Sequence, residues 1–323
     1  MWSGVGSTGR SGGAGVTPGS CHDPGVDVAI TGSTGLVGRA LSDALTAGGH
    51  RVVPMVRPAT GRDGLAWDPE SGAVDTSGLS GVGAVVHLAG EGIGGRRWNA
   101  AHKARVMESR RQGTRVLAEA LARLDLRPAV FLSASAVGWY GDRADEVLTE
   151  ESAAGAGFVA EVCREWEGAT APAEEAGIRV VHLRSGLVLS RGGGLLPRML
   201  LPFRLGVGGR LGSGHQWMSW ISIADEVAAI LHLLGADDVR GPVNLTGPEP
   251  VTNRVFTKTL GRVLRRPTVL PLPAVALKAA FGREMAGETV LISQRVLPQR
   301  LTDSGFTFAH PSLDVALRAV LDR

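Results

Sequence analysis

The chain has 323 residues, is 44% hydrophobic and carries a formal net charge of +3, which excludes a disordered protein and allows a large core. Its cations form no basic stripe interleaved with aromatic residues, so we expect no nucleic-acid partner. No apolar run reaches the roughly 18 residues of a membrane span, so we expect no membrane partner. Two cysteines, Cys21 and Cys163, predict no disulfide framework and fit a reducing cytoplasm.

Strand and helix patterns alternate over residues 27–186. Residues 1–25 are rich in Gly, Ser, Pro and Thr and lack the apolar core of a signal peptide, so we expect a flexible tail. Short apolar runs then predict strands over 27–31, 51–57, 83–90, 129–135 and 178–186. Helical spacing predicts helices over 36–50, 100–124 and 157–177, the last kinked or interrupted at Pro172. This alternation predicts a doubly wound, Rossmann-type parallel sheet.

The pattern changes after residue 186. Residues 187–220 are rich in glycine and loop signals, and we interpret them as an insertion near the substrate. A helix opens near Asp225, strand, loop and helix follow over 241–264, and the remaining elements are short and helical. We therefore predict an α/β protein with a dinucleotide-binding domain over 26–250 and a small, mostly helical C-terminal lobe over 251–323.

The stretch "TGSTGLVG" places three glycines between the first predicted strand and the first predicted helix. Gly32 permits a tight turn, Gly35 lets the backbone approach a pyrophosphate, and Gly38 allows close packing of helix on strand. In a chain with 46 glycines the spacing alone is weak, but its strand–loop–helix context favours a dinucleotide site over a simple turn. The cofactor-binding residues expected here are Gly32, Ser33, Thr34, Gly35, Leu36, Val37 and Gly38.

Cofactor choice is decided at the end of the second strand, where an acidic residue would select NAD. Arg57 stands there instead and can bind the 2′-phosphate of NADP, the alternative being a solvated charge. We predict NADP, with NAD as the alternative. The next strand ends in "HLAGEG", whose small residues leave room for a dinucleotide or mark a tight loop. They add Leu88, Ala89, Gly90 and Glu91 to the expected cofactor-binding residues.

These stretches, with "MESRRQGTR", "FLSASAVGWYG", "RVVHLRSGLVLSRGGG" and "GPVNLTGPEPV", resemble the epimerase-like, atypical short-chain dehydrogenase/reductases over about residues 27–323. The resemblance implies a Rossmann-type domain, NAD(P) binding and a small C-terminal domain of unknown role. In better-understood relatives a tyrosine transfers the substrate proton and a lysine four residues later lowers its pKa. The resemblance also implies that members of this group commonly lack the usual catalytic residues and have unknown substrates.

The usual tyrosine and lysine pair is missing from this chain. Tyr140 is the only tyrosine, and Ala144 occupies the position four residues later. The segment 157–167, where the pair is expected, contains neither residue type. Ser135 can orient a substrate hydroxyl or carbonyl, or only satisfy backbone groups. Tyr140 can donate a hydrogen bond at the substrate mouth, or only pack. These two residues are the catalytic candidates.

The loop "GRLGSGHQWMSW" contains the expected substrate-binding residues Arg210, His215 and Trp217. Arginine and tryptophan together suit an anionic, partly planar ligand, the alternative being a packed tryptophan cluster with arginines at its rim. No Cys/His spacing indicates a metal site, so we expect no metal.

We interpret the chain as an NADP-binding oxidoreductase or epimerase acting on an unidentified small molecule. One alternative is a non-enzymatic NADP(H)-sensing regulatory protein, because the Tyr/Lys pair is missing. Another is a sugar-nucleotide epimerase with tightly held NAD, which would need an acid/base pair that the sequence does not show. The proton donor, the direction of reaction, and the choice between monomer and homodimer stay open.

Overall fold

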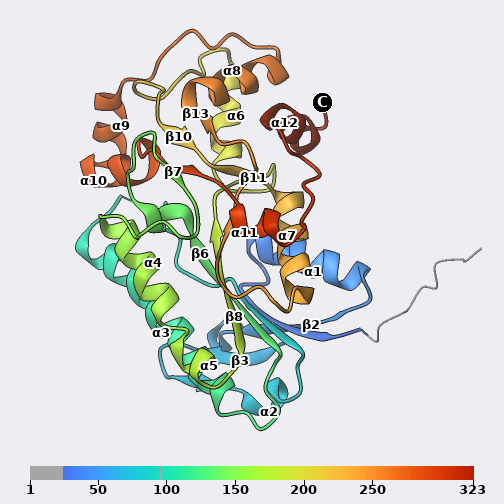
Figure 1. Ribbon diagram of the computed structural model, residues 1–323. Coiled ribbons are helices and arrows are strands. Elements are labelled where there is room, and N and C mark those ends of the chain that lie inside the picture. Colours follow the sequence, from blue (N-terminus) through green and yellow to red (C-terminus); the bar gives the residue numbers. More distant parts are fainter. Residues whose placement is uncertain (1–24, 95–96) are drawn as a thin grey trace, which may run out of the picture.

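The computed structural model describes residues 25–94 and 97–323, so the expected tail lies almost entirely outside the described residues (Figure 1). An eight-stranded sheet with the order β12-β8-β6-β5-β1-β2-β3-β4 forms its centre. The strands are β1 (Asp27–Thr31), β2 (Arg51–Val56), β3 (Leu65–Asp68), β4 (Ala73–Val74), β5 (Ala84–His87), β6 (Val130–Ala136), β8 (Arg179–Ser185) and β12 (Gly241–Leu245). All neighbours pair in parallel except β3 and β4.

The order of the strands creates a crevice at the carboxyl end of the sheet. From β1 the chain proceeds outward to β2 and β3, then returns to β5 on the other side of β1 and continues to β6, β8 and β12. Ligands of doubly wound sheets bind at such a switch point. The predicted Rossmann-type architecture is confirmed, and the predicted glycine loop follows β1 at this point.

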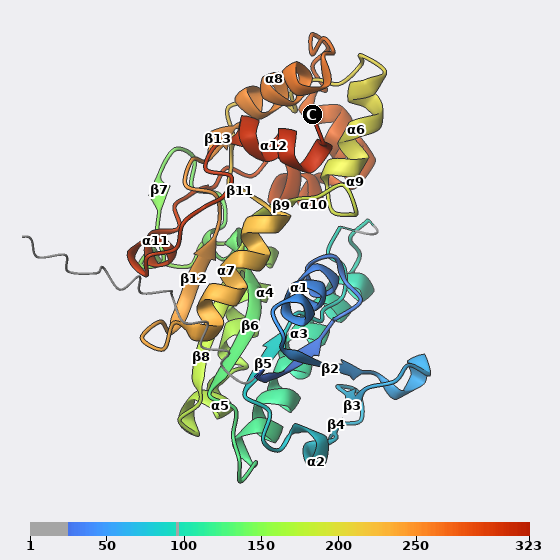
Figure 2. The ribbon, with the colours of Figure 1, turned by 90° about the vertical axis from the view of Figure 1, so that its right-hand side faces the viewer.

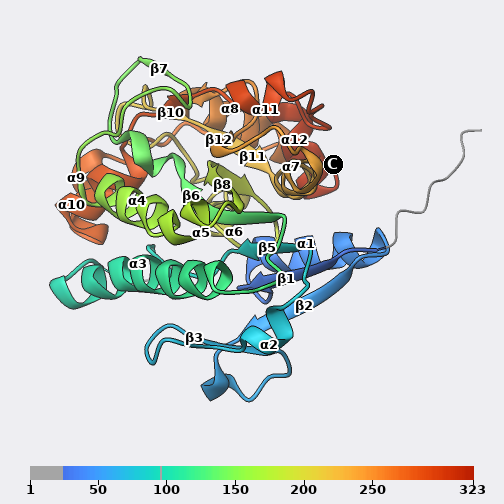
Figure 3. The same cartoon turned by 60° about the horizontal axis from the view of Figure 1, so that its bottom comes forward.

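Helices cover both faces of the sheet (Figures 2 and 3). On one face α1 (Leu36–Ala47) packs beside α7 (Ile223–Gly235), and their apolar side chains share a core with Val28 and Ile30. On the other face α3 (Ala100–Ala122) packs against α4 (Phe158–Gly168) and α5 (Ala171–Glu175), and Ala29 points into that core. Successive residues of β1 therefore alternate between two cores, as expected for a strand buried on both sides.

Two local features test the helix predictions. The expected interruption at Pro172 is confirmed, because α4 ends at Gly168 and Pro172 lies in the first turn of α5. There a missing N–H has no helical partner to lose. The helix α6 (Leu196–Arg204) was not predicted, because it contains Pro202 in its interior and follows a glycine run.

The C-terminal lobe lies beyond the carboxyl ends of the strands (Figure 1). Its core combines α6, α8 (Asn253–Leu264) and α12 (Leu313–Leu321) with β9 (Leu187–Leu189) and β11 (Trp220–Ser222). The lobe therefore includes elements before residue 251, which the predicted boundary assigns to the dinucleotide-binding domain. The remaining small elements belong to both parts of the molecule. In chain order they are η1 (Pro58–Thr60), α2 (Thr76–Leu79), η2 (Val137–Tyr140), β7 (Val147–Leu148), β10 (Trp217–Met218), β13 (Val251–Thr252), α9 (Ala274–Phe281), α10 (Arg283–Met285), η3 (Ala286–Val290), β14 (Arg295–Val296) and α11 (Gln299–Asp303). Within the described residues, every helix is too short or too polar to cross a bilayer.

Candidate cofactor site and its surroundings

The turn between β1 and α1 is packed tightly against the end of β5. Gly32 has a φ of 69°, which favours glycine, and a Cβ there would lie 2.9 Å from the backbone nitrogen of Ala89. A Cβ on Gly38 would overlap the carbonyl oxygen of Gly32 and lie 2.9 Å from the Cα of Ser33. Gly35 is exposed, and a Cβ there would meet only the Gly32 oxygen at 3.2 Å. Gly32 and Gly38 are therefore required by packing, while Gly35 presents its backbone to solvent or ligand.

The first turn of α1 is suited to an anion. Gly35 precedes the helix, no side chain caps it, and its first turn contains no acidic residue. The backbone N–H groups at the start of a helix have no helical acceptor, and they carry the positive end of the helix dipole. A phosphate placed over Gly35 would therefore find donors from the turn and the helix together.

A pocket of about 330 Å³ lies beside this turn. Its lining residues are Gly32, Ser33, Thr34, Gly35, Met55, Val56, Arg57, Thr60, Arg62, Trp67, Pro69, Leu88, Ala89, Gly90, Glu91 and Ser109. The predicted glycine loop, the predicted Arg57 and the predicted end of β5 thus meet in one cavity. Leu36, Val37 and Gly38 stand next to it, in the first turns of α1.

Sequence reasoning missed one strong feature of this pocket. Arg62 lines the same cavity as Arg57, and both arginines are exposed. The stretch "RPATGR" was a usable signal, because it places a second arginine five residues after Arg57, and the structure puts a 3-10 turn over Pro58–Thr60 between them. Trp67 and Ser109 also line the pocket, and neither had a sequence signal because their positions depend on tertiary packing.

A buried hydrogen-bonded chain supports the pocket wall at the end of β5. Thr31 Oγ1 lies 2.7 Å from His87 Nδ1, and His87 Nε2 lies 3.0 Å from Thr114 Oγ1. The N–H groups of Leu88 and Ala89 both donate to Thr31 Oγ1 at 3.2 Å. Burial lowers the pKa of His87 to about 3, so the ring is neutral at pH 7 and acts as a structural link.

The outer part of the same wall is held by α3. The Glu91 N–H donates to Ser109 Oγ at 3.0 Å, and Arg110 Nη1 donates to the Glu91 carbonyl oxygen at 2.9 Å. The Arg110 guanidinium also lies 4.6 Å from the ring of Trp166 on α4. The segment over 89–91 is thereby fixed before any ligand arrives.

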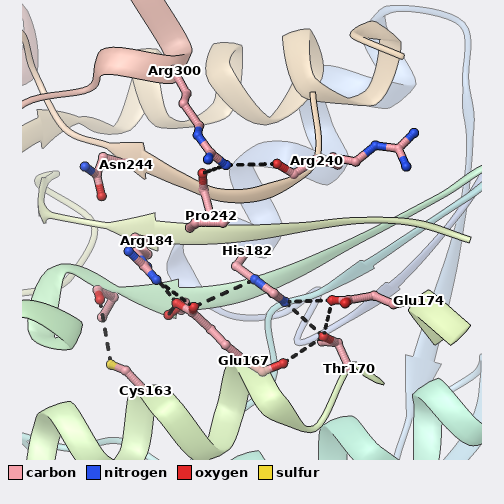
Figure 4. Close-up of polar contacts among 12 residues, drawn as sticks. Cys163, Glu167, Thr170, Glu174, His182, Arg184, Arg240, Pro242, Asn244 and Arg300 are labelled. Carbon is pink, nitrogen blue, oxygen red and sulfur yellow. Dashed lines mark hydrogen bonds and ion pairs between the residues drawn. The ribbon is translucent and has the colours of Figure 1, made fainter. Parts of the chain in front are cut away.

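The two catalytic candidates meet in a buried polar network on the α4 side of the sheet, away from the pocket lining. Ser135 Oγ donates to Glu167 Oε1 at 2.6 Å. Arg184 binds both oxygens of Glu167 at 2.8 Å (Figure 4). Tyr140 donates its hydroxyl hydrogen to Asn244 Oδ1 at 2.7 Å and accepts a bond from Arg184 at 3.1 Å. Tyr140 is fully buried, and burial raises the pKa of its phenol. This geometry supports the packing alternative for Tyr140.

Helix α4 presents no phenol or ammonium at its first turns. Phe158 packs against Trp98, and burial raises the pKa of the Cys163 thiol to about 12, so it is not a base at pH 7. The Val159 N–H donates to Glu288 Oε2 at 2.9 Å, so the C-terminal lobe supplies a carboxylate at the start of this helix. Glu288 was not predicted, because no sequence pattern links η3 to α4.

The predicted substrate residues lie in the C-terminal lobe, and each already has a hydrogen-bond partner within the protein. Arg210 donates to the Ser213 carbonyl at 2.8 Å, and His215 Nε2 lies 2.9 Å from Arg254. Trp217 Nε1 donates to Asp145 at 2.8 Å. None of the three lines the pocket described above, so their role stays a prediction. Across the described residues, no group of three or more His, Cys, Asp or Glu side chains is placed to hold a metal ion.

Glu226 in the first turn of α7 is a buried carboxyl group with an incomplete set of partners. Ser185 Oγ donates to its Oε1 at 2.6 Å, and its Oε2 has no hydrogen-bond partner within the described part of the chain. Burial raises the pKa of Glu226 from 4.5 to about 7. The folded protein therefore holds a proton here that the unfolded chain releases at lower pH.

Glu226 is expected to make the protein less stable as pH rises. Between pH 4.5 and about 7 the folded state binds more protons than the unfolded state at this residue, so the free energy of unfolding falls across that window. The loss is at most ~3 kcal/mol, and it is complete above the folded pKa. Urea unfolding of wild type and Glu226→Gln at several pH values measures it as the difference between the two profiles. Parallel profiles would show that Glu226 does not titrate in this window.

The chain is similar in sequence to known protein families and to individual proteins. The model of the NAD dependent epimerase/dehydratase family matches residues 28–246, and a domain of unknown function (DUF1731) matches residues 272–320. Epimerase family protein Mb2239 of Mycobacterium bovis is 50% identical over 292 residues, which cover 90% of this chain and 96% of that protein.

Two solved structures show the same architecture. The crystal structure of human epimerase family protein SDR39U1 with NADPH has a TM-score of 0.84 and 36% identity, covering 92% of this chain and 99% of that chain. A nucleoside-diphosphate sugar epimerase from Corynebacterium glutamicum has a TM-score of 0.74 and 40% identity, covering 92% of this chain and 58% of that chain.

Proposed function

Because this chain belongs to the NAD dependent epimerase/dehydratase family, we propose that it binds NADP(H) and acts as an oxidoreductase or epimerase on a small molecule. The observation that carries the proposal is the pocket in which the glycine turn of β1 and the two arginines Arg57 and Arg62 face one cavity. The human relative that was crystallised with NADPH supports the choice of cofactor.

The residues of the pocket fit the parts of this cofactor. The backbone N–H groups in the first turn of α1 would hold the pyrophosphate, and the exposed Arg57 and Arg62 would hold the 2′-phosphate through charge-assisted bonds. Ala89 and Gly90 leave room for a ribose at the end of β5. A bound nicotinamide would supply the hydride chemistry, while the chain supplies binding and orientation. NAD stays the alternative cofactor.

We favour Ser135 over Tyr140 as a group that orients a substrate. The hydroxyl of Tyr140 already donates to Asn244 and accepts from Arg184. Ser135 gives its hydrogen to Glu167, which leaves an oxygen lone pair free to accept a bond from a substrate hydroxyl. Ser135 stands one residue before the end of β6, at the carboxyl edge where Rossmann-type sheets bind ligands.

The activity is tested by mixing purified protein with NADPH and a panel of aldehydes and ketones and following NADPH absorbance. We expect consumption with at least one carbonyl compound, and a slower rate in Ser135→Ala. Ser133→Ala is the matched control, because Ser133 lies on the same strand and its buried hydroxyl has no partner among the described residues.

The same experiment, together with an analysis of any cofactor retained during purification, separates the alternatives. Binding of NADPH without turnover on any compound would favour the NADP(H)-sensing regulator, which the lack of a phenol and an ammonium on α4 also supports. Purification with tightly held NAD would favour a sugar-nucleotide epimerase.

A cytoplasmic location is proposed on the basis of Cys163, which is a free, buried thiol.

A further inference from the structure

Two segments of the C-terminal lobe contain no acidic residue at all. Residues 190–224 and 250–283 lack both Asp and Glu, although the whole chain has 31 acidic and 34 basic residues. The same segments carry eleven basic residues: Arg191, Arg198, Arg204, Arg210, Arg254, Lys258, Arg262, Arg265, Arg266, Lys278 and Arg283. Two of these pair with acids of α12 and its end, in the ion pairs Arg191–Asp322 and Arg262–Asp314. Positive charge is thus concentrated in one lobe of a nearly neutral chain.

The same two segments expose an unusual number of large aliphatic side chains. Val275 and Val269 are 78% and 77% exposed, and Leu205 and Leu201 are 69% and 65% exposed. We call the following group the apical patch: Leu201, Leu205, Val207, Val269, Leu270 and Val275. Helix α9 adds to it, because its sequence "AVALKAAF" has a single buried residue, Leu277. Solvent-exposed aliphatic residues that gather in this way usually mark a contact surface.

Hydrogen bonds show that the two segments lie side by side. Arg266 Nε donates to the Arg204 carbonyl at 2.9 Å, and the Leu272 N–H donates to the Arg210 carbonyl at 2.8 Å. Residues 204–212 therefore run next to residues 266–272, which lead directly into α9. Figures 1 and 2 place α6 and the connection between α8 and α9 at the end of the lobe that points away from the central sheet.

We propose that the apical patch docks on the surface of an anionic lipid bilayer. Aliphatic side chains can enter the acyl boundary while the neighbouring cations Arg204, Arg265, Arg266 and Lys278 meet lipid phosphates. Each cation held near an anionic membrane surface strengthens binding roughly fivefold. The absence of carboxylates from both segments removes the repulsion that an anionic surface would otherwise meet.

Other occupants fit the patch less well. A second copy of the chain, docked through the same patch about a two-fold axis, would bring like charges of both copies together. A bound peptide would need a groove, and neither the cofactor pocket nor the hollow lined by Asp238, Arg240 and Arg300 includes a residue of the patch. The expectation of no membrane partner rested on the lack of a spanning segment, and docking on a surface needs none.

The test is co-sedimentation of the full chain with two kinds of vesicle, one of phosphatidylcholine alone and one in which about a third is phosphatidylglycerol. We expect at least roughly tenfold stronger binding to the anionic vesicles, with an affinity that falls as salt is added. Val269→Ser/Val275→Ser and Arg204→Glu/Lys278→Glu should each weaken binding roughly tenfold or more. Leu126→Ser and Arg123→Glu are the matched controls, because both exposed residues lie between α3 and β6, at the opposite end of the sheet.

Three results would overturn the proposal. The first is no binding, or equal binding, to the two kinds of vesicle. The second is binding that the patch variants and the control variants reduce alike. The third is a concentration-dependent dimer that Val269→Ser/Val275→Ser abolishes, which would make the patch an interface between two copies of the chain. NADPH affinity of each variant is measured in parallel, and it should match that of wild type because the patch lies outside the cofactor pocket.

Discussion

Replacing Glu167 by alanine is expected to lower the free energy of unfolding by about 3–5 kcal/mol. Glu167 is 8% exposed and binds Arg184 through both carboxylate oxygens, and it also accepts the hydroxyl hydrogen of Ser135. Its removal leaves the Arg184 guanidinium, which is 2% exposed, without a carboxylate partner. A buried charge that has lost its partner costs several kcal/mol, and chemical denaturation measures that cost directly.

Glu165→Ala is the matched control for this prediction. Glu165 lies on the same helix two residues earlier and is exposed, so its loss should change the free energy of unfolding by no more than about 0.5 kcal/mol. A Glu167→Ala variant that loses less than about 1 kcal/mol would show that water replaces the carboxylate and that the network is not dry.

Replacing Gly38 by alanine is expected to unfold or severely destabilise the nucleotide-binding end of the sheet. The new Cβ would overlap the Gly32 carbonyl oxygen and lie 2.9 Å from its carbonyl carbon and from the Cα of Ser33. All of these are backbone atoms of the turn between β1 and α1, so the turn itself must shift. We expect a loss of at least about 3 kcal/mol and no measurable NADPH binding, by denaturation and calorimetry.

Gly168→Ala is the control that separates this clash from a general intolerance of alanine. Gly168 is the last residue of α4, and a Cβ there would meet nothing within 4 Å. Because alanine is a better helix former, this variant should be equally stable or up to about 1 kcal/mol more stable. Comparable behaviour of the two variants would contradict the packing argument for Gly38.

The sequence alone predicted those parts of the molecule whose structure depends on residues close together in the chain. Continuous apolar runs identified the central strands, because a parallel strand is buried on both faces. The glycine spacing identified the turn at Gly32, because its left-handed φ and its contact with Ala89 leave no room for a side chain. Strands β3 and β4 were missed, because they are four and two residues long and carry little apolar pattern.

The surroundings of the site could not be predicted in the same way. Trp67 and Ser109 reach the pocket only because β3 and α3 pack beside β2 and β5. The partners of Ser135 and Tyr140 lie 32 and 104 residues away in the chain, at Glu167 and Asn244. Such long-range contacts leave no periodic signal in a single sequence, so the direction in which a hydroxyl hydrogen points is visible only in the folded structure.

Arg57 and Arg62 are expected to select NADP(H) through its 2′-phosphate. Calorimetry of the cofactor-free protein with NADPH and with NADH, beside the Arg57→Ala/Arg62→Ala variant, tests it most directly. We predict that wild type binds NADPH roughly a hundredfold more tightly than NADH, since two charge-assisted contacts contribute about 1.5 kcal/mol each. The variant should bind both cofactors with similar, weak affinity. Equal affinities in wild type, or a preference that survives the loss of both arginines, would show that the two arginines do not select the cofactor.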